Sequence, residues 1–292
     1  MLASGNWIVA VLLIGVAAIV NYKTESFALN FKKRYRNKDD KRSFKVLTYN
    51  LNRAYDSSIN RRTDQEALEL IKAQDADIVL LQEFNPFLYE EIHNGLRAIY
   101  PFGSQDGEGS RFKSVYSRYP VLEYQQLESK REVFPICSMK FNIDGRICRI
   151  VNCHLQSNNF SKVYREWRNN SLGLLKAIRK TIALIQEGNI SRQYQVDALL
   201  EHLKDHKEPA LVCGDFNDVG GSIALKKLKS AYLMDAWWNM GNGYGFTFWG
   251  LHLRFRLDHI LYSSDNLIPS DIRVVPSVSS DHRPLVATFN IG

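Results

Sequence analysis

The chain has 292 residues, 45% of them hydrophobic, which is enough for one large domain or two small ones with a sizeable core. Its formal charge of +7 is unevenly spread, because residues 23–42 carry eight basic and three acidic side chains and the rest of the chain has 30 basic and 28 acidic ones. This distribution argues against a domain that coats nucleic acid and favours a short basic segment that faces anionic lipid headgroups.

The amino-terminal segment is apolar and uncharged as far as Lys23. Residues 2–22 just reach the roughly 20 residues that a membrane-spanning helix needs. A secretory signal peptide is the alternative, but no basic residue precedes the apolar run and no convincing cleavage site follows it. We therefore predict a single-pass membrane protein with a transmembrane signal anchor over residues 1–22, a basic juxtamembrane linker over 23–42 and a folded domain over 43–292. The basic linker favours a cytoplasmic carboxyl side, but the orientation stays open.

From Phe44 onward, the apolar pattern alternates between strands and helices. Strands are predicted over residues 44–50, 78–81, 134–142, 147–154, 210–213, 257–262, 272–275 and 284–291. Asp144 and Gly145 form a favoured hairpin turn between two of them. Helices are predicted over residues 62–74 and within 161–206, with a break near Gly188 and Asn189. Many strands with helices between them predict two mixed β-sheets packed together, with helices outside.

The long helical section shows one apolar face at helical spacing before the predicted break. Its members are Leu175, Ile178, Ile182 and Ile185.

The four cysteines lie in apolar, strand-like runs without the spacing of a metal site, and they are Cys137, Cys148, Cys153 and Cys213. We predict buried free thiols. A disulfide in an exported protein is the alternative, because pairing cannot be read from sequence.

Six short motifs place metal-ligand or proton-handling side chains at the ends of predicted strands. They are Thr48-Tyr49-Asn50, Leu81-Gln82-Glu83, Asn152-Cys153-His154, Gly214-Asp215-Phe216-Asn217, Arg256-Leu257-Asp258 and Ser280-Asp281-His282. Carboxylates, amides and two imidazoles are the groups that hold a hard divalent cation and cleave a phosphate ester beside it. Each motif alone is weak evidence, whereas the six together indicate an enzyme.

This pattern resembles the endonuclease/exonuclease/phosphatase superfamily, which includes pancreatic deoxyribonuclease, abasic-site endonucleases, bacterial sphingomyelinases and inositol polyphosphate 5-phosphatases. The resemblance covers about residues 44–292 and is most specific at residues 214–218 and 280–284. It implies an α/β fold, a four-layer α/β sandwich of two packed mixed β-sheets flanked by helices, here with an N-terminal transmembrane helix added. It also makes residues 43–292 the catalytic domain.

The resemblance implies a Mg²⁺ site, with Mn²⁺ as the alternative ion. Glu83 would be the principal ligand, Asn50 would support the same ion or its waters, and Asp281 would add a second carboxylate. A hard cation that prefers oxygen suits this set. Taken alone, Glu83 would more often be a solvated strand end.

The resemblance also assigns the catalytic groups. Asp215 would orient and deprotonate the attacking water, and Asn217 would hold that water or the phosphate. Asp258 would fix the ring of His282 and favour its protonated form, which would face the non-bridging phosphate oxygens. His154 would donate to the phosphate or assist the leaving group. The structural alternatives are an Asx turn at Asp215 and Asn217, and a satisfied core histidine at His154.

The expected reaction is hydrolysis of a phosphodiester in nucleic acid, by an endonuclease or an exonuclease. A sphingomyelinase-like phospholipid substrate and an inositol phosphate are the alternatives, and an inactive binding module or membrane scaffold is a remote one. The aromatic, glycine-rich segment over residues 237–249 could stack on bases or contact lipid, and filling the edge of the core is an equal alternative. Besides the substrate and the membrane, the sequence implies no obligate protein partner.

Overall fold

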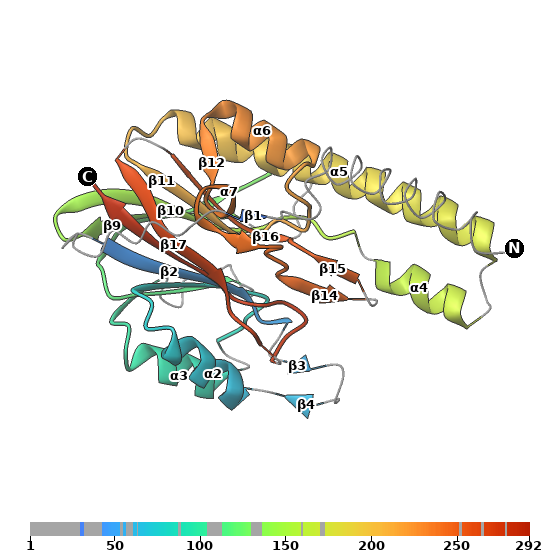
Figure 1. The fold of residues 1–292 in the computed structure, drawn as a ribbon, viewed down its shortest axis with the longest axis horizontal. Coiled ribbons are helices and arrows are strands. Elements are labelled where there is room, and N and C mark those ends of the chain that lie inside the picture. The colour runs from blue at the N-terminus through green and yellow to red at the C-terminus, as the bar shows by residue number, and fades with distance from the viewer. Residues whose placement is uncertain are drawn as a thin grey trace, which may run out of the picture.

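The computed structural model describes residues 30–31, 43–52, 55–56, 61–62, 64–86, 89–103, 113–129, 136–158, 160–169, 173–250, 253–263, 266–277 and 279–292. Within these ranges the chain forms two six-stranded β-sheets that pack against each other, with helices on their outer faces (Figure 1). The prediction of two packed mixed sheets flanked by helices is confirmed.

The first sheet has the strand order β17-β18-β2-β5-β7-β6. These strands are β2 (Ser43–Asn50), β5 (Ile78–Gln82), β6 (Phe102–Gly103), β7 (Lys113–Ser117), β17 (Leu267–Val274) and β18 (Leu285–Ile291). Only β2 and β5 are parallel neighbours in this sheet. Helices α2 (Asp64–Ala73) and α3 (Glu90–Arg97) cover its outer face, since Ile71 and Leu96 share a core with Leu47 and Val79.

The second sheet has the strand order β12-β16-β11-β10-β9-β8. These strands are β8 (Val121–Leu127), β9 (Ile136–Ile143), β10 (Arg146–His154), β11 (Ala210–Asp215), β12 (Leu233–Asp235) and β16 (Asp258–Ser263). Here β10 and β11 are the parallel neighbours. Helices α5 (Leu174–Lys204) and α6 (Ile223–Ala231) cover the outer face, since Leu199 and Leu225 share a core with Val151 and Val212.

The remaining described elements are short. They are α4 (Phe160–Arg168), α7 (Ala236–Met240) and three two-stranded ribbons, which pair β1 (Asn30–Phe31) with β13 (Asn242–Gly243), β3 (Tyr55–Asp56) with β4 (Arg61–Arg62), and β14 (Phe248–Gly250) with β15 (Leu253–Phe255).

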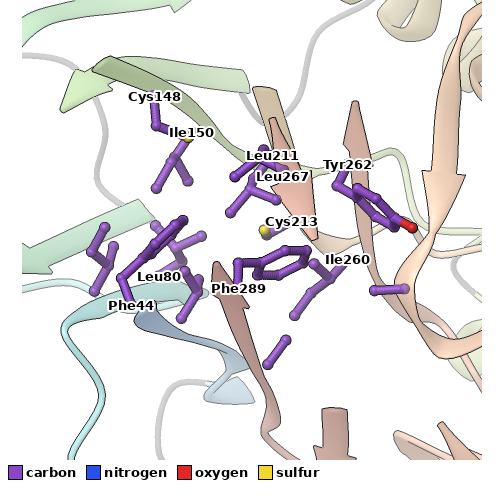
Figure 2. Close-up of a cluster of buried hydrophobic side chains, with 14 of the residues drawn as sticks. Phe44, Leu80, Cys148, Ile150, Leu211, Cys213, Ile260, Tyr262, Leu267 and Phe289 are labelled. Atoms are coloured by element: carbon purple, nitrogen blue, oxygen red, sulfur yellow. The ribbon is translucent and has the colours of Figure 1, made fainter. Parts of the chain in front are cut away.

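Side-chain alternation along the strands directs one set of residues into the space between the two sheets. Figure 2 shows this central core, where Phe44 and Leu80 of the first sheet meet Ile150, Leu211 and Ile260 of the second. Continuing at the same two-residue spacing, the inward-facing positions become polar where the strands end. These polar positions are Asn50, Gln82, Asn152, His154, Asp215 and Asp258. The polar residues of the six motifs therefore follow the apolar core to one edge of the sandwich.

Two local predictions are confirmed. Asp144 and Gly145 connect β9 to β10 with φ angles of 48° and 85°, the left-handed conformation that a two-residue hairpin turn favours. The four cysteines are free and buried. No disulfide is formed among them.

The predicted helix break near Gly188 and Asn189 is wrong, because α5 continues through both residues. A Cβ atom at Gly188 would lie 2.2 Å from Oδ1 of Asn158 and 3.0 Å from Nη1 of Arg192. The glycine thus lets a neighbouring loop approach the helix closely, at a cost of about 1 kcal/mol relative to alanine. Asn189 remains helical and accepts a hydrogen bond from Nη2 of Arg192 at 2.6 Å.

The predicted apolar face of α5 does not pack against the sheet. Leu175 is 73% exposed and Ile182 is 50% exposed, whereas Val196 and Leu199, farther along the same helix, are fully buried. Figure 1 shows that the amino-terminal part of α5 extends beyond the edge of the sheets. Helical spacing therefore located the helix correctly, but only the carboxyl-terminal half reaches the core.

The prediction of a single-pass membrane protein is not supported. In the part of the chain that the structure describes, no helix combines the length and the apolar character required to cross a bilayer. The longest described helix, α5, has 31 residues but carries charged side chains along its length. The predicted localisation, transmembrane helix and membrane partner are therefore corrected. The segment that prompted them, residues 1–22, lies outside the described residues, as does most of the predicted linker.

Two residues of the predicted linker are described. Asn30 and Phe31 form β1, which pairs with β13 in an antiparallel ribbon. The Nδ2 atom of Asn30 donates to the backbone oxygens of Trp237 and Trp238, both at 2.9 Å. These two residues therefore pack on the segment over residues 237–243.

Candidate active site

Strand register brings the inward-facing polar residues of the second sheet together. His154 lies opposite Asp215 in the parallel pair of β10 and β11, and Asp215 lies opposite Asp258 in the antiparallel pair of β11 and β16. In the first sheet, Asn50 at the end of β2 lies opposite Gln82 at the end of β5. The two parallel strands at the centre of each sheet thus end at the same edge of the sandwich, and their last inward-facing residues are polar.

The carboxylate of Asp215 is the centre of the cluster. Its Oδ2 atom accepts hydrogen bonds from Nδ2 of Asn50 at 2.9 Å and from Nδ2 of Asn217 at 3.3 Å. Two imidazole nitrogens, Nε2 of His154 and Nε2 of His282, each lie 3.7 Å from the same oxygen. Burial raises the pKa of Asp215 to about 7, although the charge of His282 works in the opposite direction. A buried carboxylate with this pKa can exchange a proton near neutral pH.

Asp258 and His282 form the predicted carboxylate–imidazole pair. Oδ2 of Asp258 lies 2.8 Å from Nδ1 of His282, and both side chains are buried. Burial alone would lower the pKa of His282, but the carboxylates of Asp258, Asp215 and Asp281 raise it to about 10. The imidazole is therefore protonated at neutral pH. The ring of Phe248 packs on it with centroids 4.9 Å apart.

Glu83 joins the cluster from the first sheet. Its Oε1 atom accepts a hydrogen bond from Nδ2 of Asn50 at 3.2 Å and lies 3.6 Å from Nε2 of His154. Glu83 and Asn217 both have left-handed backbone conformations, with φ angles of 53° and 51°. Left-handed non-glycine residues are uncommon and concentrate at functional sites. Glu83 directly follows β5, and Asn217 lies two residues after the end of β11, so a turn at the end of each strand aims the side chain at the cluster.

Asp281 completes the set of predicted residues. It precedes His282, and the hydroxyl of Ser280 connects this segment to β2 by donating to the backbone oxygen of Asn50 at 2.9 Å. The carboxylate of Asp281 lines a hollow of about 250 Å³ at the edge of the sandwich. All eight predicted site residues therefore lie in one region. Their individual roles remain predictions.

The donor set fits a divalent cation. Within the described ranges, neither Glu83 nor Asp281 has a lysine or arginine nitrogen within 4.0 Å. The cluster holds four carboxylates, those of Glu83, Asp215, Asp258 and Asp281, against two imidazoles. An excess of oxygen donors and negative charge suits a hard cation such as Mg²⁺.

The three groups that lie closest together are less suited to the metal. Single ligand atoms of Asp215, Asp258 and His282 all lie within 4.8 Å of one another. However, a metal ligand needs an unprotonated ring nitrogen, and the neighbouring carboxylates favour the protonated form of His282. The chemistry of these three residues therefore suits proton transfer, whereas Glu83 offers a partly exposed carboxylate to an ion.

Several residues that support the site were not predicted. The buried amides of Gln82 and Asn152 connect the two sheets, with Nε2 of Gln82 donating to Oδ1 of Asn152 at 2.7 Å. The hydroxyl of Thr247 accepts hydrogen bonds from the backbone N–H groups of Leu257 and Asp258 at 3.1 and 3.0 Å. Gln82 and Asn152 lie within the six motifs, so a polar side chain inside an apolar strand was the available signal. Thr247 offers no comparable signal.

Comparison with known proteins gives the same picture. The model of the Endonuclease/Exonuclease/phosphatase family matches residues 47–282. Humanised D. rerio TDP2 with 14 mutations has 15% identity and a TM-score of 0.65, covering 85% of this chain and 99% of that one. The endonuclease/exonuclease/phosphatase from Bacteroides vulgatus has 18% identity and a TM-score of 0.63, covering 86% and 99%. The human Nocturnin catalytic domain with bound sulfate has 19% identity and a TM-score of 0.59, covering 88% and 98%.

At these identities the solved structures establish the fold alone. A comparison with curated proteins finds no significant sequence match. The family match over residues 47–282 and the acid–histidine cluster define an enzyme of the phosphoesterase class, whose family members depend on a divalent metal. Since the family model matches well over half of its length, the chain belongs to the Endonuclease/Exonuclease/phosphatase family. The resemblance noted from the six motifs is thereby confirmed.

Proposed function

We propose that the protein hydrolyses phosphodiester bonds in nucleic acid with Mg²⁺ as its cofactor. The observation that carries this proposal is the environment of the Asp215 carboxylate, which receives two amide N–H groups and faces two imidazoles, each 3.7 Å away. A carboxylate that exchanges protons near pH 7, beside a protonated imidazole, is suited to general acid–base chemistry.

Each protein group has a defined task in the proposed reaction. Asp215 orients the attacking water and accepts its proton, and the amide of Asn217 holds the water or the phosphate. His282, fixed by Asp258, presents its cationic ring to the non-bridging phosphate oxygens as negative charge develops. His154 donates a hydrogen bond to the phosphate or a proton to the leaving oxygen.

The proposed metal ligands are Glu83 and Asp281, with Asn50 supporting the ion or its waters. When bound, Mg²⁺ supplies Lewis-acid stabilisation of the phosphate oxygens. The amide of Asn50 donates both to Glu83 and to Asp215. It therefore couples the position of the metal-ligand carboxylate to that of the proposed base.

The choice of nucleic acid rests on similarity and on residue chemistry. A D. rerio TDP2 structure complexed with single strand DNA product has a TM-score of 0.62 and 15% identity to this chain. The aromatic segment over residues 237–249, which contains Trp237, Tyr244, Phe246 and Trp249, lines a hollow of about 310 Å³. Aromatic rings beside a phosphate site are typical of proteins that stack on bases.

The test is a substrate panel with the full chain, Mg²⁺ present or chelated. It compares single- and double-stranded DNA and RNA with sphingomyelin and inositol phosphates. We expect nucleic acid to be cleaved, and both chelation and His282→Ala to abolish cleavage. Glu201→Ala, at an exposed position on α5, should cleave like wild type. Turnover of sphingomyelin or inositol phosphate alone would overturn the substrate, and undiminished cleavage by His282→Ala would overturn the site.

A further inference from the structure

Two guanidinium groups stack on one tryptophan beside the candidate active site. The Cζ atom of Arg283 lies 3.4 Å from the ring centroid of Trp249, and the Cζ atom of Arg254 lies 4.5 Å from it. Trp249 and Arg254 face each other across the ribbon of β14 and β15. Arg283 directly follows His282, and its backbone N–H donates to the carbonyl of Thr247 at 2.6 Å. The cation pair is therefore built on the segments that carry the active site.

Of the two cations in this pair, Arg254 is exposed and Arg283 is partly buried. Within the described ranges, neither guanidinium has a carboxylate oxygen within 4.0 Å. By contrast, the fully buried arginines are neutralised, as Arg149 is by Glu208 at 2.6 Å and Arg256 by Asp235 at 2.7 Å. Two uncompensated cations that share one ring indicate an anion from outside the chain.

The surroundings place such an anion next to the reacting phosphate. Arg254, Arg283 and Trp249 line the same hollow of about 250 Å³ as the proposed metal ligand Asp281. Trp249 and Arg283 also line the neighbouring hollow of about 310 Å³, together with Tyr244 and Phe246. A group bound at the two arginines would therefore lie between the active site and an aromatic surface.

We infer that Arg254 and Arg283, held on Trp249, form a subsite for a second phosphate group of the substrate, adjacent to the phosphate that is cleaved. This inference rests on the proposed phosphodiester hydrolysis. Guanidinium groups bind phosphate oxygens with two parallel hydrogen bonds, which gives both charge and geometric selectivity. The substrate class is thus an ester with at least two phosphates, such as a nucleic-acid strand or an inositol polyphosphate. A choline phospholipid is disfavoured, because its single phosphate is followed by a cation.

The kinetic test uses the full chain with Mg²⁺ and matched substrates. One arm compares dithymidine monophosphate with the same dinucleotide carrying an additional 5′- or 3′-phosphate. The other compares inositol 1-phosphate with inositol 1,4-bisphosphate. In one of the two arms, we expect KM to be about tenfold lower for the substrate that carries the second phosphate. This factor corresponds to one additional hydrogen bond to a charged group. The arm that shows this preference identifies the source of the phosphate.

Charge removal at the subsite should remove the preference. In Arg254→Gln and in Arg283→Gln, we expect the ratio of KM values to fall to about twofold or less. Arg254→Lys should retain part of it, because the charge remains while the planar fork is lost. The matched control is Arg146→Gln, at an exposed position in the β9–β10 hairpin, which should keep the full ratio. Equal KM values in both arms for wild type, or an unchanged ratio in both glutamine variants, would overturn the subsite.

A binding measurement separates this inference from the proposed function. Quenching of tryptophan fluorescence by thymidine 3′,5′-bisphosphate and by thymidine 5′-monophosphate is followed with the metal chelated, so that no turnover is needed. Tighter binding of the bisphosphate to wild type and Arg146→Gln, but not to Arg254→Gln, supports the subsite even if no substrate is hydrolysed. Hydrolysis without a preference for the bisphosphate refutes only the subsite. If neither hydrolysis nor the preference is observed, both the proposed function and the subsite are refuted.

Discussion

The Nδ1 atom of His282 lies 2.8 Å from Oδ2 of Asp258, while Nε2 of the same ring lies 3.7 Å from Oδ2 of Asp215. One imidazole therefore lies between two buried carboxylates that come from neighbouring strands. The negative charge on both sides offsets the effect of burial and keeps the ring protonated. The same ring also disfavours protonation of Asp215, so the states of the two groups depend on each other.

This relationship predicts the pH dependence of kcat. In the proposed mechanism, activity requires Asp215 to be deprotonated and His282 to be protonated. The rate should therefore rise as pH approaches about 7, the pKa of Asp215, and fall near 10, the pKa of His282. Because a bound cation favours the carboxylate, saturating Mg²⁺ should move the rising limb to lower pH. The measurement is kcat from pH 5 to pH 11 at two Mg²⁺ concentrations.

Asp258→Asn tests the assignment of the falling limb. The substitution removes a charge that raises the pKa of His282, so the falling limb should move to lower pH. We also expect kcat at pH 7 to drop by about 100-fold or more, a typical contribution of a positioned acid or base. An unchanged falling limb would show that another group titrates there.

Glu83→Gln tests the metal site. The amide keeps the size of the side chain but removes the charge, so the affinity for Mg²⁺ should fall by at least about tenfold, the smallest loss typical of a substituted supporting residue. Titration calorimetry with Mg²⁺ and the Mg²⁺ dependence of the rate give two independent values. Glu201→Gln, exposed on α5, is the matched control. Wild-type Mg²⁺ affinity in Glu83→Gln would reject Glu83 as a ligand.

The sequence indicated which polar residues gather in one region, but not how they are arranged there. Polar groups such as Asn50, Glu83 and Asp215 were recognisable because each interrupts or ends a run of apolar strand residues. Their contacts depend on the strand order, and β2 reaches Asp215 only because the two sheets pack with their parallel pairs together. A pattern in one strand carries no information about that packing.

Tertiary contacts also explain the failures. Considered alone, Gly188 predicts a helix break. In the structure the helix continues, and glycine is present because Asn158 and Arg192 occupy the space that a side chain would need. Leu175 and Ile182 have core-like spacing, but their part of α5 extends past the sheet. Nothing in the sequence singles out Arg254 and Arg283, because Arg254 meets Trp249 across the ribbon of β14 and β15 and Arg283 reaches it from the segment after His282.

Asn152→Ala should destabilise the fold, because the side chain of Asn152 in the second sheet forms hydrogen bonds to the first sheet. Its Oδ1 atom accepts from Gln82 at 2.7 Å, and its Nδ2 atom donates to the backbone oxygen of Leu81 at 3.1 Å. Removing it leaves a buried carbonyl without its donor, which costs about 1–3 kcal/mol. Urea unfolding followed by circular dichroism measures the loss. Asn169→Ala, at an exposed position after α4, should leave the unfolding free energy unchanged, and an equal effect of both would contradict the inter-sheet role.

Arg149→Met should destabilise the second sheet in a pH-dependent manner. The fully buried guanidinium of Arg149 lies 2.6 Å from Oε1 of Glu208, a largely buried carboxylate. Its second partner, Glu123, is 36% exposed and contributes less because solvent screens it. Breaking a buried pair by removing one partner costs about 3–5 kcal/mol. Arg146→Met, exposed on the same strand, is the control and should unfold like wild type.

The direction of the pH effect follows from Glu208. Burial alone would raise the pKa of this carboxyl, but hydrogen bonds from its own backbone and from Arg149 lower it below the ordinary value of 4.5. A carboxyl with a lowered pKa in the folded state stabilises the fold at pH values above its pKa in the unfolded state. That contribution is lost as the pH falls through its pKa in the folded state. The difference in unfolding free energy between wild type and Arg149→Met should therefore be constant above pH 5 and shrink below pH 4.5. A difference independent of pH would mean that Arg149 stabilises the sheet by packing rather than by its charge.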